Sequence, residues 1–483
     1  MRVALPMCVA LGVIAGVCPA RAQFYPGGEF DPGNALPPPG PTVPLQPGSS
    51  ISPSQIPDSA RLAPPETAPT EAPPLQTSPG QVPQAQTLAP PNSVALRQGT
   101  PDERAISLYE RPMPDYDPQG IDLPDFLLFP SVALTAKYND NVYASSQKIS
   151  DGSFGIAPKL ALRSTFTEDQ INADLASISD FYVQRDHEDY NDYQADINGK
   201  YYLTPTVVMF GQTSAAHLHE ARGSPDASIS GPEPTQYDDV VAYGGIAQTK
   251  LVLTGQADVF FERLKFWGDG ARNYDHVVAT GRVGYEVVPQ LVTFVRGSYD
   301  QRSYYATIDG FDKNSNGYST VIGADLDING VIFAEIYGGV MSQYFADPRF
   351  SSIVSPDYGV DGVWNPTDRI SLLLKVQRSI DESVTSVSPT QLVSATVDTN
   401  LTVGAQYQFT GNLLGRADYF HQVLNFRESN FEDDVDGVTA SAKYFISPFV
   451  NVSPIASFET RSSNRPGRTF DQAQLLFVVN VAY

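Results

Sequence analysis

The feature that most constrains this chain is a long series of segments in which apolar and polar residues alternate. In LTVGAQYQFT (401–410), Leu401 and Val403 fall on one face, whereas Gln406 and Gln408 fall on the other. Successive side chains of a β-strand point to opposite sides, so a period of two predicts a strand with one apolar and one polar face. We expect many such strands and almost no helix.

Short and long connections between these segments follow one another in strict alternation. Eight short turns and nine long polar loops separate 18 predicted antiparallel strands. The turns lie near 166–169, 203–205, 250–252, 288–290, 328–330, 365–369, 410–412 and 446–449, and the loops at 144–152, 184–191, 220–236, 267–273, 306–316, 346–356, 381–390, 427–435 and 462–469. An even strand number with short turns at one end is typical of an outer-membrane β-barrel.

The final segment, AQLLFVVNVAY (473–483), alternates up to Tyr483. An apolar strand without a partner would leave an exposed sheet edge. We therefore expect it to pair with the first strand near Val132–Tyr138 and to close the sheet. Closure is required in lipid, where unpaired backbone groups find no water.

A soluble β-sandwich or β-solenoid is the alternative fold, because its strands also alternate. Soluble strands average about five or six residues, whereas many runs here reach ten or more. A tilted strand needs roughly 9–11 residues to cross a bilayer. The predicted fold is therefore an all-β, closed, antiparallel transmembrane β-barrel of about 18 strands over residues 126–483.

The N-terminal region differs in composition from the predicted barrel. Arg2, the apolar run Val3–Cys18 and the Ala20-Arg21-Ala22 sequence predict a secretory signal peptide over residues 1–22. Both cysteines of the chain lie within it, so we expect a mature chain with no disulfide and no thiolate metal site.

Residues 23–125 are predicted to be a disordered Pro-rich arm on the periplasmic side. Of the 40 prolines, 25 lie between Phe24 and Pro130, and no aromatic residue occurs between Asp31 and Leu108. Such a segment buries too little apolar surface to offset the entropy of ordering. It would act as a spacer or as a docking segment for a partner or the cell wall.

The polar faces of the strands predict the lining of the barrel lumen. Eleven residues should point inward: Asn172, Asp174, Asp180, Arg296, Asp300, Arg302, Gln406, Gln408, Arg416, Asp418 and Lys443. Such mixed charges either pair along the wall or set an ion preference. Barrels of this size leave an aqueous channel, and loop 220–236 is the candidate for a constriction. The net charge of −23 argues against nucleic acid as a partner.

Several stretches, in this order, resemble the putative β-barrel porin 2 family of outer-membrane proteins. They are FLLFPSVALTAKYNDNVYAS (126–145), HLHEARGSPDA (217–227), PTQYDD (234–239), YEVVPQLVTFVRGSYDQRSYY (285–305), DPRFSS (347–352) and WNPTDR (364–369). The resemblance covers 126–483 and implies location in the outer membrane of a Gram-negative bacterium. It also implies an association with exopolysaccharide or capsule production, with polysaccharide-export components as partners.

The predicted partners also include outer-membrane lipid, lipopolysaccharide and the barrel-insertion machinery. The C-terminal residues that would form the insertion signal are Phe477, Val479, Val481 and Tyr483. Tyr483 stands where outer-membrane proteins more commonly end in Phe, and it keeps the aromatic ring. The acidic loops 186–192 and 431–437 either bind divalent cations that bridge to lipopolysaccharide or are ordinary solvated loops.

Sites for chemistry are few. His217 and His219 lie at i and i+2, so both rings share one face of a strand, with Glu220 and Asp226 nearby. Zinc takes three or four ligands, and further ligands are not evident, so the alternative is two rim histidines that bond to a neighbouring loop. Residues 312–317, DKNSNG, begin like a calcium loop, but Gly323 replaces the required Glu. We predict no cofactor.

The predicted function is a porin-like, hydrated channel or accessory pore linked to surface-polysaccharide export. The first alternative is a plugged, non-conducting barrel that anchors an export assembly through its arm. The second is an outer-membrane hydrolase, which the absence of a nucleophile–base motif disfavours. We therefore expect the protein not to be an enzyme.

Overall fold

The computed structural model describes residues 106–227, 231, 233–248, 251–388 and 391–483. The predicted signal peptide, 1–22, and the first part of the predicted arm, 23–105, lie outside these residues. Helical structure in the described chain is limited to the short 3-10 turns η2 (Leu108–Glu110), η3 (Asp186–Glu188) and η4 (Gly270–Arg272). No helix in these ranges is long and apolar enough to span a membrane.

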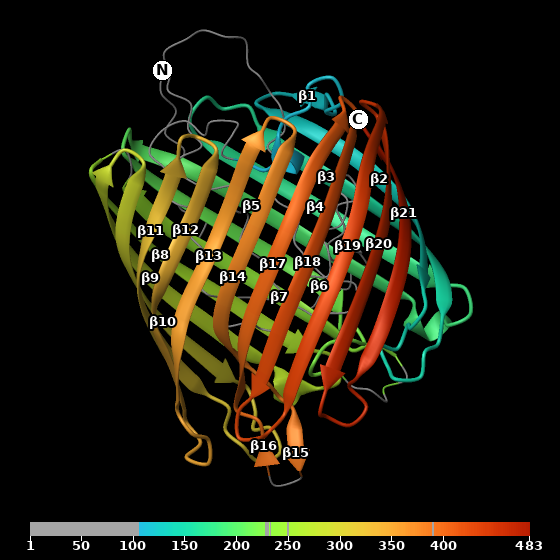
Figure 1. Ribbon diagram of the computed structural model, residues 1–483, viewed down its shortest axis with the longest axis vertical. Coiled ribbons are helices and arrows are strands. Elements are labelled where there is room, and N and C mark those ends of the chain that lie inside the picture. Colours follow the sequence, from blue (N-terminus) through green and yellow to red (C-terminus); the bar gives the residue numbers. More distant parts are fainter. Residues whose placement is uncertain (1–105, 228–230, 232, 249–250, 389–390) are drawn as a thin grey trace.

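The strands form one closed antiparallel sheet (Figure 1). It contains 19 strands, of which β1 (Ile121–Leu123) pairs only with the start of β2, so 18 strands make the barrel wall. These are β2 (Phe126–Asn139), β3 (Asp151–Ser164), β4 (Gln170–Tyr182), β5 (Tyr190–Thr204), β6 (Val207–His219), β7 (Gln236–Gln248), β8 (Leu253–Phe266), β9 (Tyr274–Val288), β10 (Leu291–Tyr304), β11 (Ser315–Ile328), β12 (Ile332–Phe345), β13 (Ile353–Thr367), β14 (Ile370–Glu382), β17 (Ala395–Thr410), β18 (Leu413–Phe426), β19 (Glu432–Ser447), β20 (Val450–Ser463) and β21 (Phe470–Ala482). The pair β15 (Ser386–Ser388) and β16 (Gln391–Leu392) forms a separate ribbon in one loop.

The predicted closure is confirmed. β21 pairs with β2 in a register that matches Val132 with Val481 and Tyr138 with Leu475. The last residue also takes part, because the Tyr483 N–H donates to the Pro130 carbonyl at 3.0 Å. The strands joined by short turns and by long loops are those predicted from the sequence, and we call the two ends of the barrel the short-turn end and the long-loop end.

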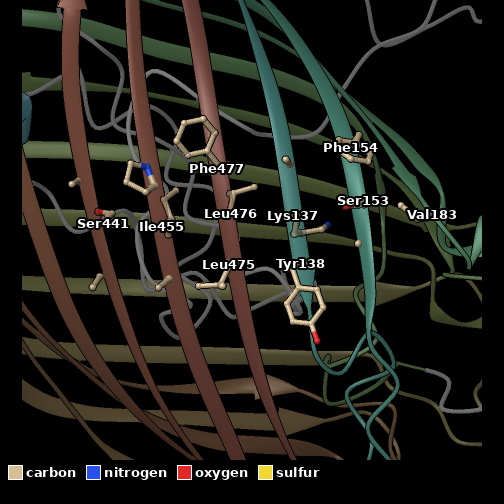
Figure 2. A pocket seen from close by; sticks show the side chains of 16 residues that line it. Lys137, Tyr138, Ser153, Phe154, Val183, Ser441, Ile455, Leu475, Leu476 and Phe477 are labelled. Atoms are coloured by element: carbon tan, nitrogen blue, oxygen red, sulfur yellow. The ribbon is translucent and has the colours of Figure 1, made fainter.

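The outer wall at this closing seam is apolar. Figure 2 shows Tyr138, Phe154 and Phe477 around the seam, where a shallow hollow of about 720 Å³ spans β19 to β3. Phe477 and Val481 are 47% and 48% exposed, as expected for side chains that face lipid. The aromatic ring of Tyr483 stacks on Phe449, with the ring centres 5.8 Å apart. The four residues of the predicted insertion signal thus lie on the outward face of β21 or directly after it.

Residues 106–125 differ from the prediction of a disordered arm. They are described by the structure, and η2 is buried within the short-turn end of the barrel. The physical reason is the return of apolar side chains after the aromatic-free stretch: Leu108, Tyr109, Met113 and Tyr116 pack on the inner wall. Contacts with the barrel therefore begin well before residue 126.

Two adjacent glycines of β12 give a test of this wall. A Cβ on inward-facing Gly339 would overlap the Thr320 carbonyl and the Val321 backbone of β11, whereas a Cβ on Gly338 would meet nothing within 4 Å. We expect Gly339→Ala to destabilise the barrel by about 1–3 kcal/mol, the usual cost of overpacking. Gly338→Ala should have little effect. The measurement is the temperature at which the folded, fast-migrating form is lost on SDS gels, and equal temperatures for the two variants would contradict the assignment of faces.

Candidate functional site

The interior of the barrel collects the polar face of the strands. All eleven residues predicted to line the lumen fall on the face opposite to the exposed apolar side chains. On β17, for example, Val403 is 45% exposed while Gln406 is 1% exposed. The polar groups that could contact a solute therefore lie in the interior of the barrel.

Charged side chains of β3 and β4 are paired along the inner wall. Asp174 accepts two hydrogen bonds from Arg163, both at 2.9 Å. Asp180 accepts a bond from Lys137, and the ion pair is almost fully buried. Asn172 donates to an asparagine of β5 at 3.1 Å. A buried charge without a partner is costly, so these pairs let the wall carry charge at low cost.

The inner face of β10 shows the same arrangement. Arg296 donates to Glu335 of β12 at 3.0 Å, and both side chains are 6% exposed. Asp300 lies 2.6 Å from Nε2 of His276 on β9. These contacts cross from strand to strand and tie the wall together.

The remaining predicted charges also lie against partners. Arg302 is 1% exposed, and its guanidinium lies 5.1 Å from the centre of the Tyr274 ring. Arg416 donates to Asp418 at 2.7 Å on the same strand. The ammonium group of Lys443 lies 4.9 Å from the centre of an aromatic ring of β19. Most of the predicted charges of the wall are thus paired with a group of opposite charge.

At the short-turn end, the segment 106–117 occupies part of the interior. Its backbone is held by the wall: the Leu108 N–H donates to Ser371 Oγ at 2.9 Å, and the Tyr109 N–H donates to Gln406 Oε1 at 3.0 Å. Gln408 lies two residues closer to this end on β17 and is half-buried. Its N–H donates to the Arg369 carbonyl at 3.0 Å. A predicted lumen residue, Gln406, is therefore covered by the chain itself.

Apolar side chains of this segment pack against inward residues of distant strands. Leu108 and Tyr109 are 4% and 9% exposed and join a cluster that includes Ala133 and Phe445. Tyr116 contacts the Phe445 ring, with the centres 5.6 Å apart. The sequence signal for this contact was the reappearance of Tyr and Met after residue 108. The prediction of a disordered arm, which rested on the proline content, did not take it into account.

At the long-loop end, residues 220–227 of the loop between β6 and β7 fold over the interior. Its residues Gly223, Ser224 and Pro225 are buried. Asp226 accepts hydrogen bonds from Ser383 Oγ at 2.8 Å, from Thr385 Oγ1 at 2.7 Å and from a backbone N–H of the same loop, 383–394. The loop predicted as a constriction is therefore attached to a loop more than 150 residues away.

Two arginines of the loop 464–469 complete this contact. Arg465 donates to the Pro225 carbonyl at 3.0 Å and to Asp433 at 3.1 Å. Arg468 donates to the carbonyls of Ser224 and Ala227, while burial, followed by the neighbouring Arg465, lowers its pKa to about 10. We call Asp226, Ser383, Thr385, Arg465 and Arg468 the Asp226 junction. Sequence reasoning did not find the two arginines.

Lys313 of the segment 312–317 also holds the loops together. It is fully buried and donates to the carbonyls of Ser383 and Val393 at 2.9 and 3.1 Å. Asp312 accepts the Asn314 N–H at 3.0 Å, an arrangement within the segment itself. Lys313 thus links this segment to the loop 383–394.

His217 and His219 lie at the outer rim of the long-loop end. Nδ1 of His217 is 2.7 Å from Asp238, and its ring stacks on Tyr193. Nδ1 of His219 is 2.8 Å from Asp192. Each ring has its own carboxylate, and no group of three or more His, Cys, Asp or Glu able to hold a metal is found in the described chain. The geometry is that of two rim histidines bonded to neighbouring strands.

The two acidic loops make contacts within the protein. Glu188 of 186–192 binds Arg222 through two hydrogen bonds at 3.0 and 2.6 Å. In 431–437, Asp436 accepts a hydrogen bond from Tyr419 at 2.7 Å and Asp433 pairs with Arg465. Residues 432–437 are the start of β19 and not part of a loop, and 190–192 are the start of β5.

Comparison with known proteins identifies the family but no curated relative. The family model described as Putative beta-barrel porin 2 matches residues 113–483. No curated protein matches the chain.

Several solved structures of Pseudomonas aeruginosa proteins are similar to this chain at low sequence identity. OpdL is 12% identical with a TM-score of 0.40 and covers 75% of this chain and 99% of its own. OccK2 (OpdF) in complex with glucuronate is 12% identical with a TM-score of 0.42, at 75% and 100% coverage. The siderophore receptor PirA is 8% identical with a TM-score of 0.43, at 76% and 81% coverage.

Replacing Asp226 tests the junction. In Asp226→Ala the loops 220–235 and 383–394 lose three hydrogen bonds to a carboxylate, each contributing about 1.5–3 kcal/mol. We expect faster proteolysis within these loops, measured by mass spectrometry of the folded protein in detergent. The matched control is Asp269→Ala, which removes an exposed carboxylate from the loop 267–273. Equal cleavage rates in the two variants would show that Asp226 does not hold the loops.

Proposed function

The chain belongs to the Putative beta-barrel porin 2 family, and from this membership we propose that it forms a hydrated pore that serves surface-polysaccharide export. It is a porin-like β-barrel of the Gram-negative outer membrane. The observation that carries the pore is the polar inner face, where charged groups such as Arg163 and Asp174 are paired within the wall.

Pairing within the wall favours passage of large hydrated solutes without strong charge selection. Unpaired charges on the wall would bind a solute of opposite charge. Paired charges still offer hydrogen bonds but leave only a weak electric field in the lumen. A polysaccharide presents many hydroxyl groups and would exchange hydrogen bonds with such a wall. The link to polysaccharide rests on the family resemblance, and the character of the wall supports it.

We propose that the short-turn end faces the periplasm. Bacterial barrels have short periplasmic turns and longer outer loops. Residues 106–117 enter the barrel at the short-turn end, so the preceding arm would lie in the periplasm, within reach of export components. The Asp226 junction would then narrow the passage at the cell surface.

A plugged, structural barrel is the second candidate. It is favoured by the segment 106–117, which packs inside the short-turn end. In that case the arm and the inserted segment would anchor an export assembly and the lumen would not conduct. Neither candidate requires catalysis, and we propose that the protein is not an enzyme.

Single-channel recording in planar bilayers separates the two candidates. We expect stable openings from the full mature chain, and a larger conductance after deletion of residues 24–118, because the deletion removes the segment from the interior. Both chains must first show heat-modifiable mobility, which reports a folded barrel. Silence of both folded chains would contradict the pore and favour the structural barrel.

Addition of polymer then tests the proposed solute. A neutral polysaccharide added on the side of the short turns should produce reversible blockades of the current. An equal concentration of a monosaccharide should not. If a conducting barrel shows no blockades, the proposal of a pore stands, but its role in polysaccharide export is contradicted.

A further inference from the structure

The barrel wall is divided at one place, between β13 and β14. Their ladder runs from the turn at Thr367 and Ile370 to Gly359 and Gln377, and ends there. The six residues of β13 from Ile353 to Tyr358 extend beyond this point. Elsewhere the hairpins that begin at short turns remain paired almost to the long-loop end, as β11 and β12 do up to Ser315 and Phe345.

Both strands continue past the end of their ladder, each held by its other neighbour. β13 pairs with β12 as far as Ile353 and Gln343, and β14 pairs with β17 as far as Glu382 and Ala395. The ribbons of β13 and β14 diverge toward the end that carries β15 and β16 (Figure 1). The wall therefore separates into two parts here, and we call this place the β13–β14 slit.

Pro356 lies in the part of β13 that is not paired with β14. Continuing the register would match Tyr358 with Arg378 and Pro356 with Ile380. Proline has no N–H to donate and is confined to sheet edges, bulges and strand starts. On β13 it lies where the strand has become an edge on the side of β14.

Side chains, and not backbone hydrogen bonds, close the slit. Arg378 donates to Ser355 Oγ at 3.1 Å on the side of β13 and to Thr399 Oγ1 at 2.6 Å on the side of β17. Beside it, an apolar cluster joins the two parts, with Met341 and Ile353 from one side and Ile380, Ala395 and Val397 from the other. Opening this contact costs fewer backbone hydrogen bonds than opening any fully paired hairpin.

Beside the slit lies a small cavity of about 50 Å³. Its lining includes the inward-facing polar residues Asp300, Gln343, Asp357 and Ser379, together with Arg378 and Ile380 of the slit. Val278 and Met341 also line the cavity, so a few polar groups stand among apolar ones.

The slit opens toward lipid at the level of an aromatic girdle. Val354 is matched with Ser342, and Ser342 with Tyr318. Val354 and Tyr318 are 68% and 54% exposed on the outer wall. Tyrosine rings on a transmembrane barrel mark the boundary between hydrocarbon and water. The molecules that adjoin the slit from outside are therefore membrane lipids of the leaflet on the long-loop side.

We propose that the β13–β14 slit is a lateral binding site for an acyl chain of such a lipid. The hydrocarbon chain enters between Ile353 and Ile380, and the polar end reaches the cavity lined by Asp357 and Ser379. Binding requires only displacement of the Arg378 side chain and of the apolar cluster. The site lies in the wall and does not depend on whether the lumen conducts.

Photolabelling tests this site. The full mature chain is reconstituted in vesicles of phosphatidylethanolamine and phosphatidylglycerol with a fatty acid that carries a diazirine close to its carboxyl end, and adducts are located by mass spectrometry. Lipid contacts outward-facing residues at every strand, so the decisive residues are Met341 and Ile353, which face inward. We expect adducts on these residues, and adducts confined to outward-facing residues would overturn the proposal.

A disulfide across the slit supplies the control. The natural cysteines lie in the predicted signal peptide, so an introduced pair stands alone. Oxidation of a Tyr358→Cys/Arg378→Cys variant should abolish the adducts on Met341 and Ile353, and reduction should restore them. The matched pair Val360→Cys/Val376→Cys, which lies within the existing ladder, should leave them unchanged. Adducts that persist in the oxidised first variant would contradict entry through the slit, and if its disulfide does not form, the location of the adducts in the natural chain decides.

Discussion

The structure depends on one constraint, the absence of water in the hydrocarbon core of a membrane. A backbone N–H or carbonyl without a partner there costs several kcal/mol, so a membrane sheet must have no open edge. The pairing of β2 with β21 meets this demand by bringing together residues more than 300 positions apart in the chain. The alternation of side chains then follows, since the outer face must be apolar and the inner face is free to be polar.

The inner face of this barrel carries charged side chains. Carboxylates and guanidinium groups that would be costly alone are placed in pairs, such as Arg296 with Glu335 and Arg416 with Asp418. The two ends of the barrel differ: an apolar segment that includes Tyr109 fills part of the short-turn end, and the Asp226 junction draws the loops together at the other end. In the described wall, β13 and β14 form the one hairpin in which side-chain contacts replace the backbone pairing over a long part of the strands, at the β13–β14 slit. Passage through the lumen and exchange with the membrane thus involve different parts of the molecule.

The sequence allowed the barrel to be predicted because lipid imposes its pattern locally. Leu401 and Val403 alternate with polar neighbours within one strand, and each turn or loop is read from adjacent residues. The contacts that could not be predicted join distant residues: Tyr109 and Gln406 are 297 positions apart, and Arg465 and Pro225 are 240 apart. Nothing in either local segment specifies its partner. Pro356 was visible in the sequence as a residue unsuited to a central strand, but its place beside the unpaired end of the β13–β14 ladder depends on the strand order.

The most direct test of the account is a disulfide across the closing seam. Leu134 and Val479 are register partners on β2 and β21, at the separation that a disulfide requires. In a Leu134→Cys/Val479→Cys variant of the mature chain, folded in vesicles and oxidised, we predict a disulfide within one chain. A Leu134→Cys/Leu475→Cys variant, four residues out of register, should form none. A chain that stays reduced in the first variant, or that forms the disulfide only between two molecules, would show that the sheet does not close on itself.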